Sequence, residues 1–255
     1  MLSAFVKDES GAISVDWTVM AAAAVGLGLA SVTAVSTGTG SLGENIRASL
    51  SGASTASLRW AFASETVRQS FGDGDFTGWS QARQGDFGEW GPMQGPFGRD
   101  TADEPLTYAV ALGDGNSNAL IEFDMLIIDS WDGVADPSNP WANAQGDVMR
   151  PQINGQEIAV EPFVHREDHP GYRPGMFEDR SSSVTIDGAT YNVSMTMTDA
   201  PTSNVGGAGW NDQRWRVQVE ALDAPQNFDL GFSSPVDQNI NDESWGISNF
   251  SVKEN

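Results

Sequence analysis

The sequence predicts an N-terminal apolar helix joined to an all-β sandwich. Residues 17–43 contain no charged side chain, whereas from residue 71 short apolar or alternating runs are separated by Gly, Asp, Asn and Pro. The first part of the uncharged stretch approaches the length of about 20 residues with which a helix crosses a bilayer. It also lacks the polar face of a soluble amphipathic helix. Many short strands between turn residues are typical of a β-sandwich or jelly roll.

Changes in composition divide the chain into four segments. Residues 1–11 form a short charged leader, and residues 12–43 form a hydrophobic helix that ends in a glycine-rich break. Residues 44–70 carry an apolar stripe at helical spacing, which predicts a second, amphipathic helix or a stalk. Residues 71–255 contain the turn-rich sequence of the β-sandwich domain.

The charge of the chain lies almost entirely in its β domain. The formal net charge is −22, and residues 71–255 contain thirty acidic but only nine basic side chains. A surface this acidic repels phosphate backbones, so nucleic acid is excluded as a partner. There is no cysteine, which excludes a disulfide framework, a thiol nucleophile and a cysteine-ligated zinc.

The N-terminus carries a family resemblance in the run Phe5-Val6-Lys7-Asp8-Glu9-Ser10-Gly11-Ala12-Ile13-Ser14-Val15-Asp16-Trp17. This run resembles the start of Flp-type (type IVb, Tad-system) pilins, in which a charged leader ending in glycine precedes an apolar helix. The resemblance implies cleavage by a prepilin peptidase after Gly11, with Ala12 as the first mature residue. Asp16 then stands at the fifth mature position, where the family usually has Glu.

The same resemblance implies a Tad-type assembly apparatus as partner and self-assembly with other pilin subunits. The precursor is then expected in the bacterial inner membrane, with the mature domain periplasmic, on the cell surface or in a pilus. In an assembled bundle the Asp16 carboxylate can pair with the new ammonium of Ala12 in a neighbour; the alternative is an interfacial aspartate in water. A secretory signal cleaved near Ala34-Val35-Ser36 is the competing interpretation of the apolar segment.

Six strands are predicted in the C-terminal body, at residues 119–128, 183–186, 191–197, 214–220, 228–232 and 246–252. Residues 132–151 and 162–182 are expected to be long loops, which often carry function. Fragments such as Gly74-Asp75-Phe76-Thr77-Gly78-Trp79 and Asp242-Glu243-Ser244-Trp245-Gly246 resemble lectin-like (concanavalin/laminin-G-type) jelly rolls. In that family the first and last strands often share a structural calcium, although Ser248 stands where the closing strand usually has aspartate.

Clustered carboxylates suggest Ca²⁺ as a cofactor, since oxygen ligands suit this ion. The candidate ligands are Asp73, Asp75, Asp129, Asp132, Asp242 and Glu243. The alternative is that these acidic groups only form solvated turns. Trp131, between two of the aspartates, is a candidate for stacking on a sugar ring; the alternative is that it packs in the core.

No catalytic constellation is complete. Glu122 and Asp124 match the first two positions of a glycosidase strand motif whose third carboxylate would stand at Ile127. His165 and His169 lie four apart, but a zincin helix needs Glu directly after the first histidine, and prolines on both sides disfavour a helix. This segment is expected to be a surface loop.

We therefore expect a non-enzymatic pilin-like or pseudopilin subunit that displays an adhesive β-sandwich, as a minor or tip subunit. The alternative is a membrane-anchored, calcium-dependent module that binds a carbohydrate or another surface ligand without assembling into a pilus.

Overall fold

The computed structural model describes residues 20–22, 59–61, 63–99, 105–135, 137–140, 144–203 and 211–255. The chain divides into two compact units, residues 1–58 and 59–255. In the first unit, residues 20–22 are helical. The predicted leader, and the predicted hydrophobic helix apart from these three residues, lie outside the described part. No helix within the described residues is long and apolar enough to span a membrane.

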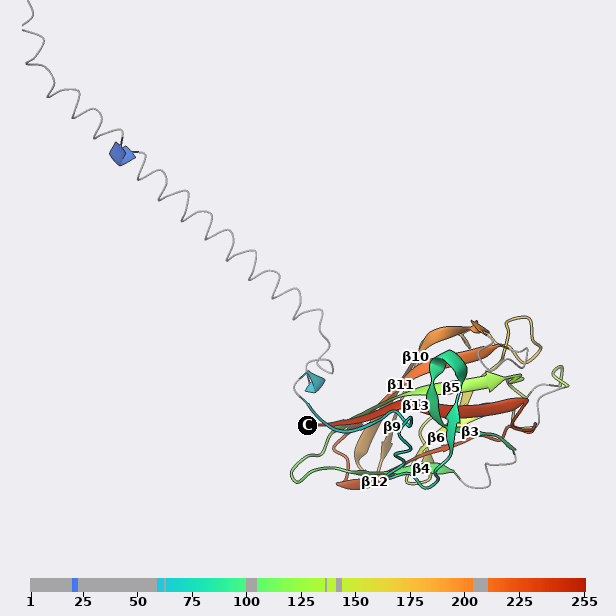
Figure 1. The fold of residues 1–255 in the computed structure, drawn as a ribbon, viewed down its shortest axis with the longest axis horizontal. Helices are drawn as coiled ribbons and strands as arrows, with labels where there is room; N and C mark the ends of the chain where they lie inside the picture. Colours follow the sequence, from blue (N-terminus) through green and yellow to red (C-terminus); the bar gives the residue numbers. More distant parts are fainter. Residues whose placement is uncertain are drawn as a thin grey trace, which may run out of the picture. The chain divides into compact units, whose positions relative to one another are not determined.

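The second unit consists of two antiparallel sheets (Figure 1). Within the described residues, eight strands form the first sheet, in the order β2-β3-β13-β5-β11-β10-β9 with β1 also paired to β13. Five strands form the second sheet, in the order β4-β12-β6-β7 with β8 paired to β6.

The first sheet contains β1 (Ser64–Gln69), β2 (Gln84–Asp86), β3 (Pro92–Phe97), β5 (Ala119–Asp129), β9 (Arg180–Ile186), β10 (Ala189–Ser203), β11 (Asp212–Leu222) and β13 (Glu243–Glu254). The second sheet contains β4 (Leu106–Ala111), β6 (Val148–Ile153), β7 (Gln156–Glu157), β8 (Glu161–Pro162) and β12 (Asn227–Ser233). A single 3₁₀ turn, η2 (Gly88–Trp90), precedes β3.

One hydrophobic core joins the two sheets. Ile121 and Phe123 of β5 pack in the same buried cluster as Tyr108 of β4 and Leu230 of β12. The Phe123 and Phe232 rings meet edge to face at 5.0 Å, an arrangement favoured by the ring quadrupoles. The predicted β-sandwich character is therefore confirmed.

Strand β5 is buried on both of its faces, which explains its almost continuous apolar sequence. Its alternate residues, such as Phe123 and Ile127, point into the core between the sheets. Leu126 and Ile128 point to the other side, where they are covered by Trp90 of η2 and Met93 of β3. A strand covered on one face only would show strict alternation.

The six predicted strands are confirmed. Each predicted run lies inside an observed strand, namely β5, β9, β10, β11, β12 and β13. The remaining strands of this unit are at most six residues long, and several of them are polar. Their local patterns therefore carry little strand signal.

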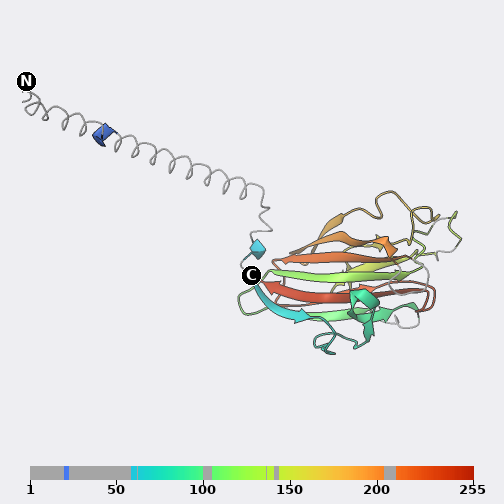
Figure 2. The ribbon, with the colours of Figure 1, turned by 45° about the horizontal axis from the view of Figure 1, so that its top comes forward.

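The predicted helix or stalk over residues 44–70 is wrong at its C-terminal end. Ser64–Gln69 is a strand, β1, that pairs antiparallel with the C-terminal half of β13 (Figure 2). The boundary predicted at residue 71 is accordingly too late, because the compact unit begins at Arg59. Gln69 is buried, and its side chain accepts a 2.7 Å hydrogen bond from Trp79 Nε1. A partner at the far end of the chain cannot be read from local periodicity.

We predict that residues 59–255 fold alone into a β-rich domain and that residues 71–255 form a less stable one. Loss of Gln69 leaves the indole N–H of Trp79 without its partner, which costs about 1–3 kcal/mol in the free energy of unfolding. Circular dichroism and urea denaturation of the two fragments measure the difference. Equal stability would show that β1 contributes nothing to the domain.

Candidate functional site

Three neighbouring strands bring carboxylates to one end of the first sheet. Asp129 ends β5, Glu243 begins β13 and Asp212 begins β11. The β5–β13 register pairs Asp129 with Glu243, and Gln213 of β11 pairs with Ile127. Because antiparallel neighbours run in opposite directions, the end of β5 lies beside the starts of both partners. The Asp129 N–H donates to Asp212 Oδ1 at 2.9 Å.

Two long loops, residues 130–147 and 163–179, meet at this end of the sheet. They touch so closely that a Cβ on Gly171 would lie 1.8 Å from the backbone oxygen of Asp132. The Val134 N–H donates to Gly171 O at 3.2 Å. The second loop is anchored by Arg180, whose guanidinium lies over the Phe163 ring at 4.8 Å from its centroid. The predicted long loops are therefore present in part: residues 148–151 belong to β6, residue 162 to β8 and residues 180–182 to β9. The remaining loop segments pack against each other.

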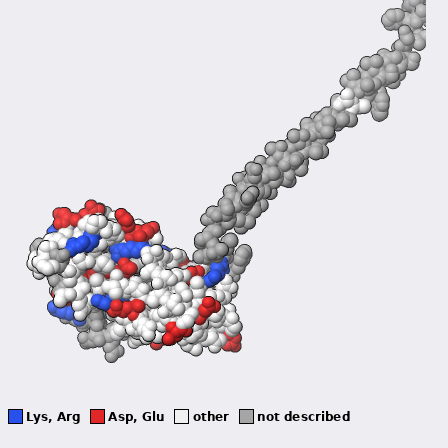
Figure 3. Space-filling view, turned by 180° about the vertical axis from the view of Figure 1, so that it is seen from behind, with Lys and Arg blue, Asp and Glu red and all other residues white. Residues whose placement is uncertain are grey.

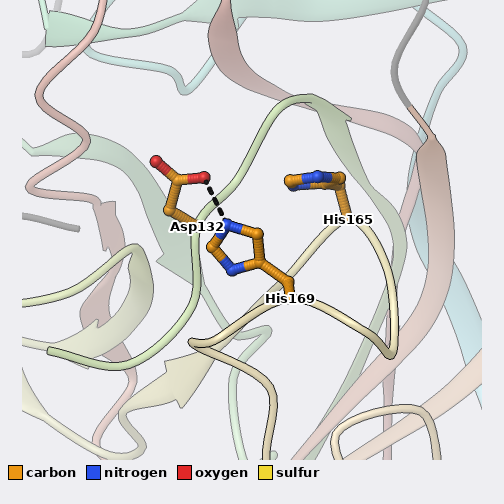
Figure 4. A group of neighbouring side chains, drawn as sticks. All are labelled: Asp132, His165 and His169. Carbon is orange, nitrogen blue, oxygen red and sulfur yellow. Dashed lines mark ion pairs between the residues drawn. The ribbon is translucent and has the colours of Figure 1, made fainter. Parts of the chain in front are cut away.

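Asp132 is the centre of the site that these loops create. It is 4% exposed, and its backbone N–H donates to Asp147 Oδ2 at 2.5 Å. Its side-chain Oδ1 lies 3.3 Å from His169 Nε2 (Figure 4). Its Oδ2 accepts a 3.4 Å hydrogen bond from Gln238 Nε2. Each carboxylate oxygen of Asp132 thus faces a different part of the site.

The two histidines are buried, so the predicted surface loop is wrong. His165 is 3% exposed and His169 is 5% exposed, with ring centroids 4.9 Å apart. His165 Nδ1–H donates to Trp131 O at 2.9 Å, because a carbonyl only accepts. His169 Nδ1 accepts the Gly171 N–H at 3.1 Å, which leaves its proton on Nε2, toward Asp132. The prolines prevent a helix here, but the loop still folds back onto β5.

Both rings are neutral at neutral pH. Burial is the main effect that lowers the pKa of His169 to about 4, and the nearby Arg166 guanidinium adds to it. Burial also lowers the pKa of His165 below its usual range. A neutral imidazole keeps one nitrogen lone pair, which is the form that binds metals.

A buried carboxylate triad, defined as Asp132, Asp147 and Glu243, adjoins the histidines. One oxygen of each residue lies within 4.8 Å of the others. Asp147 is 0% exposed, and its Oδ1 has no hydrogen-bond partner in the described part of the chain. Glu243 accepts hydrogen bonds from the Asp237 and Gln238 backbone N–H groups at 3.2 and 3.1 Å.

Burial opposes ionisation of this triad. Burial is the largest of the effects that raise the pKa of Asp132 to about 6, and nearby acidic groups raise this pKa further. Burial and mutual proximity also raise the pKa of Asp147 and of Glu243. Carboxylates held this close in the protein interior retain a proton or take up a cation.

A pocket of about 290 Å³ opens beside Asp132. Seven side chains line it, and each carries a polar or charged group: Ser130, Asp132, His165, Arg166, His169, Gln238 and Asp242. Asp242 accepts a 2.7 Å hydrogen bond from the Ser130 hydroxyl. A solute can therefore reach Asp132 and the two histidines from outside. Inside the pocket it would meet both a positively charged side chain, Arg166, and a negatively charged one, Asp242.

Four of the six predicted calcium ligands gather at this end of the sheet, and two do not. Asp129, Asp132, Asp242 and Glu243 belong to the paired strand ends or line the pocket. Asp73 and Asp75 instead lie exposed in a turn, where their side chains accept the N–H groups of Asp75 and Thr77. Such local hydrogen bonds are typical of Asx turns, and neither residue belongs to a metal-competent group in the described residues.

Trp131 is not available to a sugar. It is 0% exposed, and its indole N–H donates to Ser244 O at 2.9 Å. The alternative interpretation, that this tryptophan packs in the core, is correct. Its burial follows from the T-shaped contact with Phe163, at 5.8 Å between centroids, under the second loop.

Glu122 and Asp124 form cross-strand ion pairs. Glu122 pairs with Lys253 and accepts a 2.8 Å hydrogen bond from Gln218. Asp124 pairs with Arg216 at 2.5 Å. Neighbouring strands thus supply the partners of the two carboxylates that match part of the glycosidase motif.

Sequence reasoning missed Asp147, Asp212 and the role of both histidines. Asp147 stands alone in a polar loop, and Asp212 stands in a run of Asn, Asp and Gln, so neither has a local signal. The histidines do have one, because they are the only two in the chain and lie in a predicted long loop. Their partner Asp132 is more than thirty residues away in sequence.

Comparison with known protein families and with curated proteins finds no match to this chain.

We predict that Asp129→Asn stabilises the domain at alkaline pH. Burial, Asp212 and Asp242 raise the pKa of Asp129 from 3.8 to about 7. Between these values the folded chain holds more protons than the unfolded chain, so stability falls as pH rises through this window. At about pH 8 the neutral amide should raise the free energy of unfolding by about 1 kcal/mol, with little effect at about pH 4.

Urea denaturation at the two pH values measures this effect, and Asp73→Asn is the matched control. Asp73 is exposed, and its side chain caps a turn that Asn caps equally well. The positive φ of 68° at Asp129 also suits Asn. A pH-independent effect of Asp129→Asn would contradict the prediction.

Proposed function

We propose that this chain is a pilin-like subunit that displays its β-sandwich as an extracytoplasmic interaction domain, with the binding site at the end remote from the tether. The observation that supports it is the register of β13. Its C-terminal residue Glu254 pairs with Ser64, where the chain enters the sheet, and its first residue Glu243 pairs with Asp129 at the site. The two ends of this twelve-residue strand are eleven residue steps apart, about 36 Å at about 3.3 Å per residue.

This separation suits display. The chain enters the domain at the Ser64 end of β13, and the site lies at the opposite end of this strand. The two long loops lie at that far end, and loops on a rigid scaffold commonly carry binding residues. In this proposal the sandwich is a lectin-like jelly roll, and the polar pocket takes the hydroxyl groups of a glycan or of another surface ligand.

The N-terminal half of the proposal rests on the resemblance to Flp-type pilins. A prepilin peptidase would cleave the precursor in the inner membrane, and a Tad-type apparatus would assemble the product. The large domain suits a minor or tip subunit better than a closely packed major subunit. Asp16 would pair with the Ala12 ammonium of a neighbouring subunit.

The surface is compatible with exposure to solvent. On the face shown in Figure 3, basic side chains lie beside acidic ones at several places. Arg68 and Glu65, which are both exposed, form an ion pair at 2.6 Å. Exposed pairs of this kind add little stability. The negative net charge favours solubility of the displayed domain.

A second candidate is a membrane-anchored, calcium-dependent binding module that does not assemble. It is favoured by the carboxylate triad, because the triad supplies oxygen donors for calcium and one of its members, Asp132, lines the pocket. In this version calcium would hold the loops in place for a carbohydrate. The two candidates differ in the fate of the N-terminus.

We predict that the mature protein begins at Ala12. Intact-mass spectrometry and N-terminal sequencing of the protein from its native membrane measure this directly. Gly11→Val should leave the leader in place, because the family's processing motif ends in glycine, whereas Gly28→Val serves as a control inside the apolar run. A new N-terminus near Ser36 would instead establish a secretory signal. An intact Met1 would establish a plain anchor and support the second candidate.

A further inference from the structure

We propose that Asp132, His165 and His169 form a binding site for a divalent transition metal of the zinc class, open to the pocket on one side. The inference is independent of how the N-terminus is processed. It differs from the calcium expectation, because two of the three donors are imidazole nitrogens, which suit zinc and related ions better than calcium.

The donor geometry fits such an ion. One ligand atom from each of the three residues lies within 4.8 Å of the others. The Asp132 Oδ1 and His169 Nε2 atoms are 3.3 Å apart. Two ligand atoms at about 2.0–2.1 Å from a tetrahedral centre are separated by about this distance. Figure 4 shows all three side chains directed toward one region.

The surroundings orient the donors. His165 donates its Nδ1–H to Trp131 O, which places the lone pair on Nε2. Asp132 is held through its backbone N–H by Asp147 Oδ2 and through its Oδ2 by Gln238. Histidine–carbonyl hydrogen bonds of this type are the usual outer shell of a metal-bound imidazole.

A second observation points to a cation at this place. The Oδ1 atom of Asp147 is buried and lacks a hydrogen-bond partner within the described residues, and Asp147 belongs to the triad that includes Asp132. A buried acceptor without a partner is costly. A cation bound to Asp132 would attract the nearby Asp147 carboxylate, and this attraction is strong because the dielectric constant of the protein interior is low. The cost of burying Asp147 Oδ1 would therefore fall.

His169 must change its tautomer to bind. Its proton lies on Nε2 while Nδ1 accepts the Gly171 N–H. A metal ion at Nε2 takes the place of that proton, which moves to Nδ1. The protonated Nδ1 can no longer accept the Gly171 N–H, so this hydrogen bond is lost in exchange for the metal bond. The pocket beside the three ligands supplies the entry path and leaves a further coordination position open to water or to a ligand.

The test is a titration of the full chain, purified in detergent without a polyhistidine tag, with Co²⁺ and then Zn²⁺. We expect one Co²⁺ per chain with the intense visible bands of a low-coordinate site, and displacement of these bands by Zn²⁺. His165→Gln and His169→Gln should each weaken binding by about a hundredfold or more. Asp73→Asn, which alters an exposed carboxylate, should leave binding unchanged.

A melting curve for each variant without metal separates loss of the site from loss of the fold. If a histidine variant does not fold, X-ray absorption of the Zn²⁺-loaded wild-type chain decides, since imidazole ligands give characteristic multiple scattering. Absence of imidazole scattering, absence of Co²⁺ binding, or binding that both histidine variants retain would overturn the proposal. Stabilisation by Ca²⁺ alone would also overturn it and would assign the ion to the carboxylates.

Discussion

Strand β5 pairs along most of its length with β11 on one side and with β13 on the other, and the domain depends on this pairing. Its side chains are buried on both faces, so the strand contributes to the core between the sheets and to the smaller cluster under η2. A shift of either strand pairing by one residue would turn Phe123, and the other β5 side chains that point the same way, out of the core. Polar side chains would enter the core in their place. The register is therefore strongly specified, and it decides which strand ends meet.

The site is a consequence of that register. Asp129 and Glu243 are adjacent because they end and begin paired strands, and Asp212 begins the other neighbour of β5. The loops that cover these ends are then held by specific contacts, such as the close approach of Gly171 to Asp132. Several acidic groups become buried together in this way. Burying like charges is unfavourable, which is why these groups are the candidates for a functional site.

The acidic side chains of the domain occur in two different structural environments. On the outer face of β5, carboxylates such as Glu122 and Asp124 are matched by Lys253 and Arg216 from neighbouring strands. At the end of the same strand, burial and neighbouring carboxylates raise the pKa of Asp129 and Asp132. The first group stabilises strand pairing modestly, whereas the second group is poised to take up protons or a cation. Net charge alone does not distinguish these two situations.

The sequence by itself determined that the C-terminal body is a β domain and where its longest strands lie. Apolar runs such as residues 119–128, bounded by Gly, Asp and Asn, predict strands from local sequence alone. The same residues are buried in the folded domain, so their apolar character also favours the fold. It also determined that Asp129 stands at a strand end, because this residue directly follows the apolar run of residues 119–128.

Only the tertiary structure decided which of these groups meet. Strand β1 forms because the distant β13 offers it an edge, and His165 and His169 are buried because a loop folds back onto Asp132. Trp131 is withdrawn from solvent for the same reason. These contacts join residues tens to nearly two hundred positions apart, and pairing at such distance is set by sheet register and loop packing, which local sequence patterns do not encode.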